Sequence, residues 1–212
     1  MIMGEEIAVM DIVVATNNPG KLEELREIAQ DWPVRLVGPQ ELGLVPDALE
    51  TGSSFDENAL IKARSLHRQA GSWVMADDSG LVVDYIEGAP GIYSARYAGD
   101  AATDRENCDL LLEHLKKAGP GERQAHFHCS LAVISPDGRE ALYHGRTDGS
   151  IARAASGTAG FGYDPVFVPL GGQGTLAELP PHEKNAISHR GQALRLFLEQ
   201  QFARPAGLER ER

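Results

Sequence analysis

One loop in this sequence has the residue types and spacing needed to hold a phosphorylated ligand. Thr16-Asn17-Asn18-Pro19-Gly20-Lys21 follows a short apolar stretch and precedes a helical pattern. Such a loop presents backbone N–H groups and the positive end of a helix dipole, and Lys21 adds a charge. It is not a Walker A loop, because Ala15 and Leu22 replace its first glycine and its metal-binding Ser/Thr. The alternative is an ordinary strand-to-helix turn with an exposed lysine.

Carboxylates form a second candidate group. Asp77-Asp78-Ser79-Gly80 is a turn signal between two apolar stretches, and Glu50 precedes the turn at residues 51–52. Neighbouring side chains on a strand point to opposite faces, so one aspartate at most is expected to face a given site unless the turn reorients them. Magnesium prefers one or two carboxylates together with phosphate oxygens and water. Glu50 and Asp78 are therefore a candidate magnesium pair, and a capped turn is the alternative.

Aromatic and cationic residues form a third group. Phe161-Gly162-Tyr163-Asp164 joins two rings, a glycine and a carboxylate, and Lys184, His189 and Arg190 follow before the last helical pattern. A ring beside a glycine suits a flat base that slides in against it. The alternatives are a tight turn with core aromatics and a basic surface patch.

Asn58 and Lys62 lie four residues apart in a helical pattern. Residues at this spacing are neighbours on one helix face. Taken alone, the pair is typical of a solvent-exposed polar stripe.

The apolar periodicity places these groups on or between secondary-structure elements. Strands are expected at residues 12–15, 34–37, 73–76, 81–86 and 166–168, with a hairpin of strands at 125–134 and 140–147. Helices are expected from residue 21, at 54–70, after a capping box at Thr103 and Glu106, and at 192–202. The hairpin interrupts the alternation of strands and helices, which favours an α/β fold with a mixed sheet.

The composition restricts the partners and the compartment. The chain of 212 residues is 42% hydrophobic and 24% charged, as in globular proteins, and its net charge of −11 opposes a nucleic-acid surface. No apolar run is long enough to span a membrane. Cys108 and Cys129 lack metal-ligand spacing and are expected to be buried thiols. A cytoplasmic protein that binds neither nucleic acid nor membrane is expected.

Taken together, the ordered motifs resemble the inosine/xanthosine triphosphate pyrophosphatase family over about nine-tenths of the chain. The segments that carry the resemblance span residues 15–21, 55–59, 62–63, 76–81, 88–99, 160–165, 177–179 and 183–190. No single motif is decisive, but the ordered set is highly specific. The resemblance implies an elongated mixed sheet flanked by helices, two lobes with a central cleft, and a homodimer.

The resemblance also implies a role for each candidate residue. The loop of residues 16–21 would hold the triphosphate, and Glu50 and Asp78 would bind Mg²⁺. Asp78 would be catalytic by positioning the attacking water, with Asp77 an alternative partner in proton transfer, because a metal lowers the basicity of its ligand. The substrate would also contact Lys62, Ser79 and Arg96, and at the nucleoside end Phe161, Gly162, Tyr163, Asp164, Lys184, His189 and Arg190.

Donors at the nucleoside end would select the base. A donor from His189 or Arg190 can meet the 6-keto oxygen of hypoxanthine or xanthine, whereas the amino group of adenine places donor against donor. Guanine carries the same 6-keto oxygen, so its rejection requires a contact to its 2-amino group. The expected reaction is magnesium-dependent hydrolysis of ITP, dITP or XTP to the monophosphate and pyrophosphate, which cleanses the nucleotide pool. Two alternatives are a broader-specificity nucleoside triphosphate pyrophosphatase and a catalytically silent nucleotide-binding protein.

The motifs predict a single two-lobed domain at residues 11–203. An N-terminal extension at 1–10 precedes it, and a frayed polar tail at 204–212 follows. The sequence departs from the family pattern at residues 180–182, where Pro180 and Pro181 replace polar helix-starting residues.

Overall fold

The computed structural model describes residues 9–119 and 121–202, in which helices cover both faces of a mixed six-stranded sheet. The strand order is β2-β1-β3-β4-β5-β6. The strands are β1 (Met10–Val14), β2 (Val34–Val37), β3 (Val74–Val83), β4 (Gln124–Ile134), β5 (Glu140–Ile151) and β6 (Phe167–Pro169). The helices are α1 (Pro19–Ala29), α2 (Phe55–Ala70), α3 (Asp104–His114), α4 (Pro181–Ile187) and α5 (His189–Gln201).

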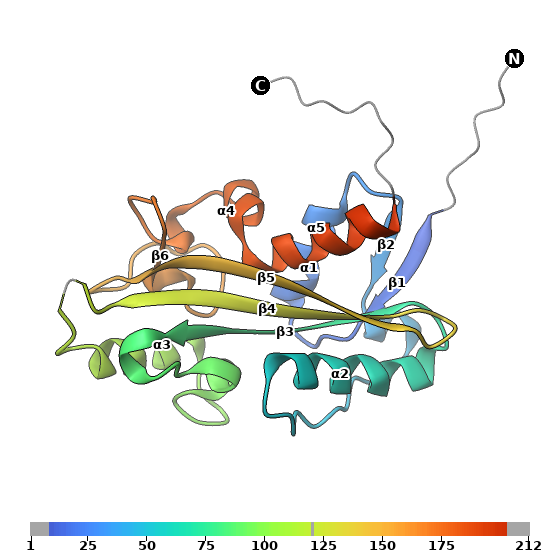
Figure 1. Ribbon diagram of the computed structural model, residues 1–212, viewed down its shortest axis with the longest axis horizontal. Helices are drawn as coiled ribbons and strands as arrows, with labels where there is room; N and C mark the ends of the chain where they lie inside the picture. The colour runs from blue at the N-terminus through green and yellow to red at the C-terminus, as the bar shows by residue number, and fades with distance from the viewer. Residues whose placement is uncertain (1–8, 120, 203–212) are drawn as a thin grey trace, which may run out of the picture.

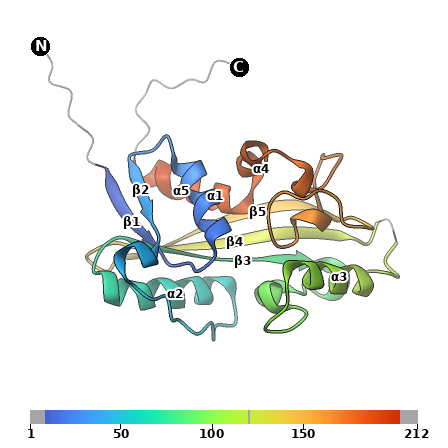
Figure 2. The ribbon, with the colours of Figure 1, turned by 180° about the vertical axis from the view of Figure 1, so that it is seen from behind.

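The sheet is parallel at one end and antiparallel over the rest. β1 pairs in parallel with β2 and β3, whereas β3, β4, β5 and β6 pair in antiparallel order. Strands β3 to β5 run the length of the molecule, with α2 and α3 on one face and α1, α4 and α5 on the other (Figure 1). The reverse view shows the same two layers (Figure 2). The predicted α/β fold with an elongated mixed sheet is confirmed.

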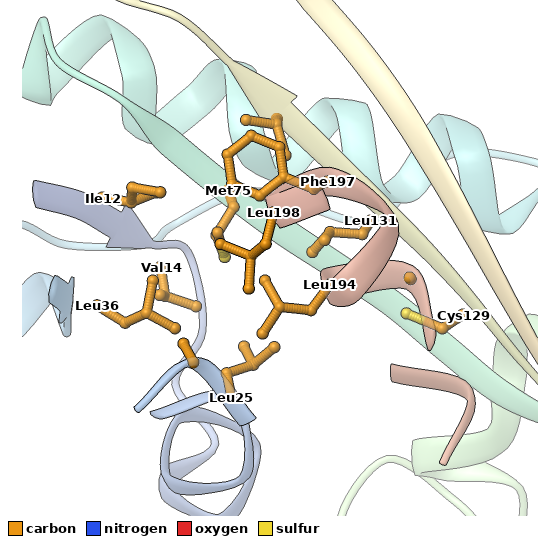
Figure 3. Close-up of a cluster of buried hydrophobic side chains, with 13 residues drawn as sticks. Ile12, Val14, Leu25, Leu36, Met75, Cys129, Leu131, Leu194, Phe197 and Leu198 are labelled. Atoms are coloured by element: carbon orange, nitrogen blue, oxygen red, sulfur yellow. The ribbon is translucent and has the colours of Figure 1, made fainter. Parts of the chain in front are cut away.

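Buried apolar side chains gather at both ends of the long strands. One cluster packs Ile12, Met75 and Leu131 of the sheet against Leu25 of α1 and Phe197 of α5 (Figure 3). A second cluster lies under α2, and a third joins α3 to the far ends of β3, β4 and β5. The first two clusters lie at the β1 end of the long strands, and the third lies at their other end.

The prediction of two strands around an aspartate turn was wrong. Residues 74–83 form one uninterrupted strand, paired with β4 from Val74↔Ile134 to Val83↔Ala125. Asp77 and Asp78 can both lie within this buried strand because a cationic side chain neutralises each of them. Gly80 fits because it packs against the carbonyl of Gly91, where a Cβ atom has no room. Tertiary contacts thus override the local turn preference.

The segment before the last helix was also predicted incorrectly. Pro181 does not break the chain but occupies the first turn of α4, where a missing N–H costs nothing. The closing helix begins at His189, three residues before the predicted start, because the hydroxyl of Ser188 caps it by accepting from the N–H of Gly191. Lys184, His189 and Arg190 therefore lie on helices and not in a loop.

The boundaries of the other elements agree closely with the sequence patterns. Ser54 caps α2, and the capping box of Thr103 and Glu106 opens α3 as predicted. β5 extends past residue 147 to Ile151, because its end pairs with β6. β1 begins at Met10, inside the expected extension, whereas residues 1–8 and 203–212 lie outside the described residues.

Cys108 and Cys129 are buried free thiols, as expected. Burial raises the pKa of each thiol to about 12. Among the described helices, none is long and apolar enough to cross a membrane.

A substitution at Gly145 tests how closely α5 packs on the sheet. A Cβ atom on Gly145 would meet the backbone of His189 and Ala193, so Gly145→Ala must push α5 away. We expect the free energy of unfolding to fall by about 1–3 kcal/mol in urea denaturation. Gly121→Ala, where nothing lies within 4 Å of the added carbon, is the control. A Gly145→Ala chain as stable as the parent would contradict the close packing.

Candidate active site

A cleft collects residues from many separate parts of the chain. Its floor is the middle of β3, and its walls come from the first loop, η3 (Gly91–Arg96), the start of α3, residues 161–164 and helices α4 and α5. Of the predicted site residues, the cleft is lined by Asn18, Lys21, Ser79, Phe161, Gly162, Tyr163, Asp164, Lys184, His189 and Arg190.

Asp77 is the buried centre of one side of this cleft. Its Oδ2 atom accepts hydrogen bonds from Lys21 Nζ at 2.9 Å and from Arg190 Nη2 at 3.1 Å. The hydroxyl of Ser79 donates to the same oxygen at 2.7 Å. Burial alone would raise the pKa of Asp77, but the charges of Lys21 and Arg190 hold that pKa well below its ordinary value. Asp77 is therefore a permanent anion that positions Lys21, and a poor proton acceptor.

Asp78 points to the opposite face of β3, toward α2. Lys62 Nζ lies 2.6 Å from Asp78 Oδ1 and 3.0 Å from Glu50 Oε1, so one ammonium group bridges the two carboxylates. Asn58, fully buried, donates to Asp78 Oδ2 at 3.4 Å. Arg96 lies 3.7 Å from Glu50. The structure thus gathers Glu50, Lys62, Asp78 and Arg96 into one group, which we call the acidic group.

The two aspartates differ in basicity. Burial, together with the nearby charge of Glu50, raises the pKa of Asp78 despite the opposing effect of Lys62. Lys21 also lowers the pKa of Asp78, which means that the cation of the cleft acts electrostatically on the acidic group. Of the two, Asp78 is the better proton acceptor.

The first loop places its side chains unequally. Asn18 caps α1 by accepting from the N–H of Lys21, which turns Lys21 toward Asp77. Asn17 points away from the cleft and hydrogen-bonds to Pro46 and Gln40. Gly20 lies so close to the Phe161 ring that a Cβ atom would be 3.1 Å from it. Thr16, Asn17, Pro19 and Gly20 support the loop without lining the cleft.

Aromatic rings form the far end of the cleft. His189 stacks on Phe127 with ring centroids 4.8 Å apart and planes 7° apart. Burial and the neighbouring charge of Arg190 lower the pKa of His189 well below its ordinary value, so this imidazole is neutral. Its Nδ1 atom is buried and has no hydrogen-bond partner within the described part of the chain. A neutral ring in the cleft wall suits contact with a polar ligand edge.

Lys184 and Arg190 are held in the cleft wall by carboxylates. Lys184 Nζ donates to Asp164 at 2.6 Å and lies 3.5 Å from Glu24. Arg190 donates to Glu24 at 3.0 Å as well as to Asp77. Both cations also lie over the face of the Phe161 ring, at 4.5 and 5.5 Å from its centroid. A surface basic patch is ruled out, because both side chains are buried.

Several residues of the site carried no clear signal in the sequence. Glu24 lies three residues after Lys21 on α1 and is buried, although no motif in the sequence marks it. The spacing of Asn58 and Lys62 alone was typical of an exposed stripe, and only the family resemblance gave Lys62 a role, yet both side chains face Asp78. Asp104 and Phe127 also line the cleft. In the sequence, Asp104 has the appearance of a residue in the first turn of a helix and Phe127 that of a core residue, so neither indicated a site.

The sequence is similar to that of known proteins over most of its length. The sequence matches the Ham1 family over residues 12–200. The chain belongs to the Ham1 family. It is 49% identical over 196 residues to the dITP/XTP pyrophosphatase of Erwinia tasmaniensis, covering 91% of this chain and 95% of that protein. With the dITP/XTP pyrophosphatase of Escherichia coli O157:H7 it shares 50% identity, over 89% of this chain and 96% of that one.

Solved structures of Ham1 proteins have the same fold. The Coxiella burnetii HAM1 protein matches with a TM-score of 0.82 and 44% identity, covering 92% of this chain and 99% of that one. The Staphylococcus aureus Ham1 protein matches with a TM-score of 0.80 and 38% identity, over 92% of this chain and all of that one. Cleft and acidic group both lie within the matched region of this Ham1 chain.

Arg190 tests the buried charge network of the Ham1 cleft. Arg190→Met removes the buried cation that Asp77 and Glu24 share and leaves them only Lys21 and Lys184, respectively, as cationic partners. Breaking a buried pair costs about 3–5 kcal/mol. We expect that loss of unfolding free energy in urea denaturation. Arg105→Gln, on an exposed pair with Asp109, should change it by less than about 0.5 kcal/mol. Equal effects of the two substitutions would contradict the role of Arg190.

Proposed function

We propose that this chain hydrolyses non-standard purine nucleoside triphosphates, with dITP and XTP as substrates, to the monophosphate and pyrophosphate. Water adds to phosphorus, and the α–β phosphoanhydride bond breaks. The observation that carries the proposal is the near 50% identity, over nine-tenths of the chain, to proteins named dITP/XTP pyrophosphatase.

The shape of the cleft supports this substrate. The base would lie against Phe161 and beside the stacked His189, where a flat ring fits between aromatic side chains. A neutral imidazole can present an N–H to a 6-keto oxygen, and the amino group of adenine cannot accept it. Three nitrogens of Arg190 already donate to carboxylates, so His189 is the better-placed donor.

The phosphates would extend from the cleft toward the acidic group. Lys21, only 19% exposed, stands on the cleft side of β3, and Lys62 and Arg96 stand on the other side. Their positive charges offset the net charge of −11 that would otherwise repel a polyphosphate. Pairing with Asp77 holds Lys21 in place before the substrate arrives, which reduces the entropy lost on binding.

We further propose that Mg²⁺ is the cofactor and that Glu50 and Asp78 hold it. The donor set fits this ion. The carboxylates of Glu50 and Asp78 come from different segments and both accept from the ammonium group of Lys62, so their oxygens converge on one positive charge. Carboxylate oxygens are the ligands that Mg²⁺ prefers. When bound, Mg²⁺ would neutralise the charge that develops on the phosphate oxygens.

Asp78 would orient the attacking water. Asp77 is committed to Lys21, Arg190 and Ser79, whereas Asp78 lies beside Glu50, so Asp78 is the carboxylate of the pair that is placed to hold the water. The side-chain amide of Asn58 donates a hydrogen bond to Asp78 Oδ2 and so helps to fix the orientation of this carboxylate. Asp77 acts as the residue that positions Lys21.

Two further attributes belong to the same proposal. A homodimer is supported by the family resemblance of the motifs. A cytoplasmic location is supported by the free thiols of Cys108 and Cys129, which suit a reducing compartment.

Product analysis with a nucleotide panel tests the function. With Mg²⁺ present, dITP and XTP should each release one pyrophosphate and no orthophosphate, and dATP should turn over at least about 100-fold more slowly, as expected when a hydrogen-bond donor meets the wrong edge. Comparable turnover of dATP, dCTP and dITP would overturn purine selectivity. Orthophosphate as the product would overturn the bond assignment.

Asp78→Asn tests the reaction step. Removing the charge should lower kcat for dITP by at least about 100-fold, while binding of the nucleotide persists. Asp109→Asn, at an exposed position on α3, is the matched control and should retain the parent kcat. Circular dichroism checks that both variants are folded. An Asp78→Asn enzyme within twofold of the parent would remove Asp78 from the mechanism.

A further inference from the structure

Three side chains of the types that bind metal ions lie close together on the α2 face of the sheet, outside the cleft. Asp56 lies in the first turn of α2, His128 on β4 and His144 on β5. One donor atom from each of the three lies within 4.8 Å of the others. None of them lines the cleft or belongs to the acidic group. We call these residues the histidine cluster.

The hydrogen bonds within the cluster show that its donor atoms converge. Asp56 Oδ1 accepts from Ser130 Oγ at 2.5 Å and from His144 Nε2 at 2.8 Å. His128 Nε2 lies 3.0 Å from the same Ser130 hydroxyl. Because the single hydroxyl proton of Ser130 goes to Asp56, His128 donates to Ser130. Two imidazoles are thus aimed at one carboxylate and one hydroxyl.

The surroundings fix the two rings without enclosing them. His128 lies against Phe55, with ring centroids 5.0 Å apart, and 5.8 Å from the ring of His144. The side chains of His144 and Asp56 are 49% and 43% exposed, so an ion has an open path to the cluster. Three protein ligands with one open side match the usual arrangement of a four-coordinate site completed by water.

The ligand types select the kind of metal. Two imidazoles and a carboxylate suit Zn²⁺ and its neighbours in the first transition series, whereas Mg²⁺ prefers sites made of oxygen atoms. We propose that Asp56, His128 and His144 bind one divalent transition-metal ion of the zinc class. This site is separate from Glu50 and Asp78, and its test does not depend on the proposed function.

The position of the cluster indicates what the ion would do. Ser130 pairs across the sheet with Asp78 on one side and with His144 on the other, so the two histidines lie on β4, next to the strand of Asp78, and on β5, one strand further. A bound ion ties the start of α2, through Asp56, to β4 and β5. Since α2 also carries Lys62, the ion fixes the helix that positions the acidic group. Binding to the folded chain alone also stabilises the fold.

A metal titration of the tag-free full chain tests the site. Zn²⁺ is titrated against a chromophoric chelator at about pH 7.5, above the ordinary pKa of histidine, with excess Mg²⁺ to occupy oxygen-ligand sites. We expect one equivalent of bound Zn²⁺. His128→Asn and His144→Asn should each weaken its binding by at least about tenfold. His182→Asn, which removes an exposed imidazole on α4, should bind as the parent does.

Two further measurements guard against variants that fail to fold. Co²⁺ added to the parent chain should give the visible absorption of tetrahedral imidazole coordination, and its absence would overturn the proposal without any variant. Zn²⁺ should raise the Tm of the parent but not that of the double variant His128→Asn/His144→Asn. No stoichiometric binding, or undiminished binding by a folded double variant, would show that the cluster is a hydrogen-bonded network only.

Discussion

A buried carboxylate in the middle of β3 sets the arrangement of the whole site. Asp77 is 2% exposed, and an ionised group at that depth is tolerated only when cations and donors surround it. Lys21 comes from α1 and Arg190 from α5, so the same charge ties two helices to the sheet. Arg190 and Lys184 both form ion pairs with Glu24, and Lys184 also pairs with Asp164. The wall of the cleft is thereby built around one anion.

The strand geometry gives the two adjacent aspartates, Asp77 and Asp78, different surroundings and different roles. Because successive side chains alternate across a strand, Asp77 faces α1 and α5 whereas Asp78 faces α2. The first is paired with Lys21 and Arg190, whose charges hold its pKa well below the ordinary value and make it a poor proton acceptor. The second shares a lysine with Glu50 and has a raised pKa. Two adjacent residues of one type thus support the fold and the chemistry separately.

The α2 helix connects the two groups of polar side chains on this face. Asn58 and Lys62 reach Asp78, and Asp56 reaches the histidine cluster on β4 and β5. The helix itself rests on the small residues Ala59 and Ala63, which allow it to approach the sheet closely. Its polar face is therefore directed inward at its N-terminal half. This orientation explains why a stripe with the appearance of a solvated surface is part of the site.

The sequence alone determined the elements with strong local signals. Apolar periodicity located β1, β2, the β4–β5 hairpin and α2, and a capping box located the start of α3. The ordered motifs also identified the family and ten of the residues that line the cleft. Only the tertiary structure decided that residues 74–83 form one strand and that Arg190 is buried against Asp77 and Glu24. Local propensity describes a residue beside its chain neighbours, whereas neutralisation of a buried charge depends on partners more than 50 residues away, such as Lys21 for Asp77.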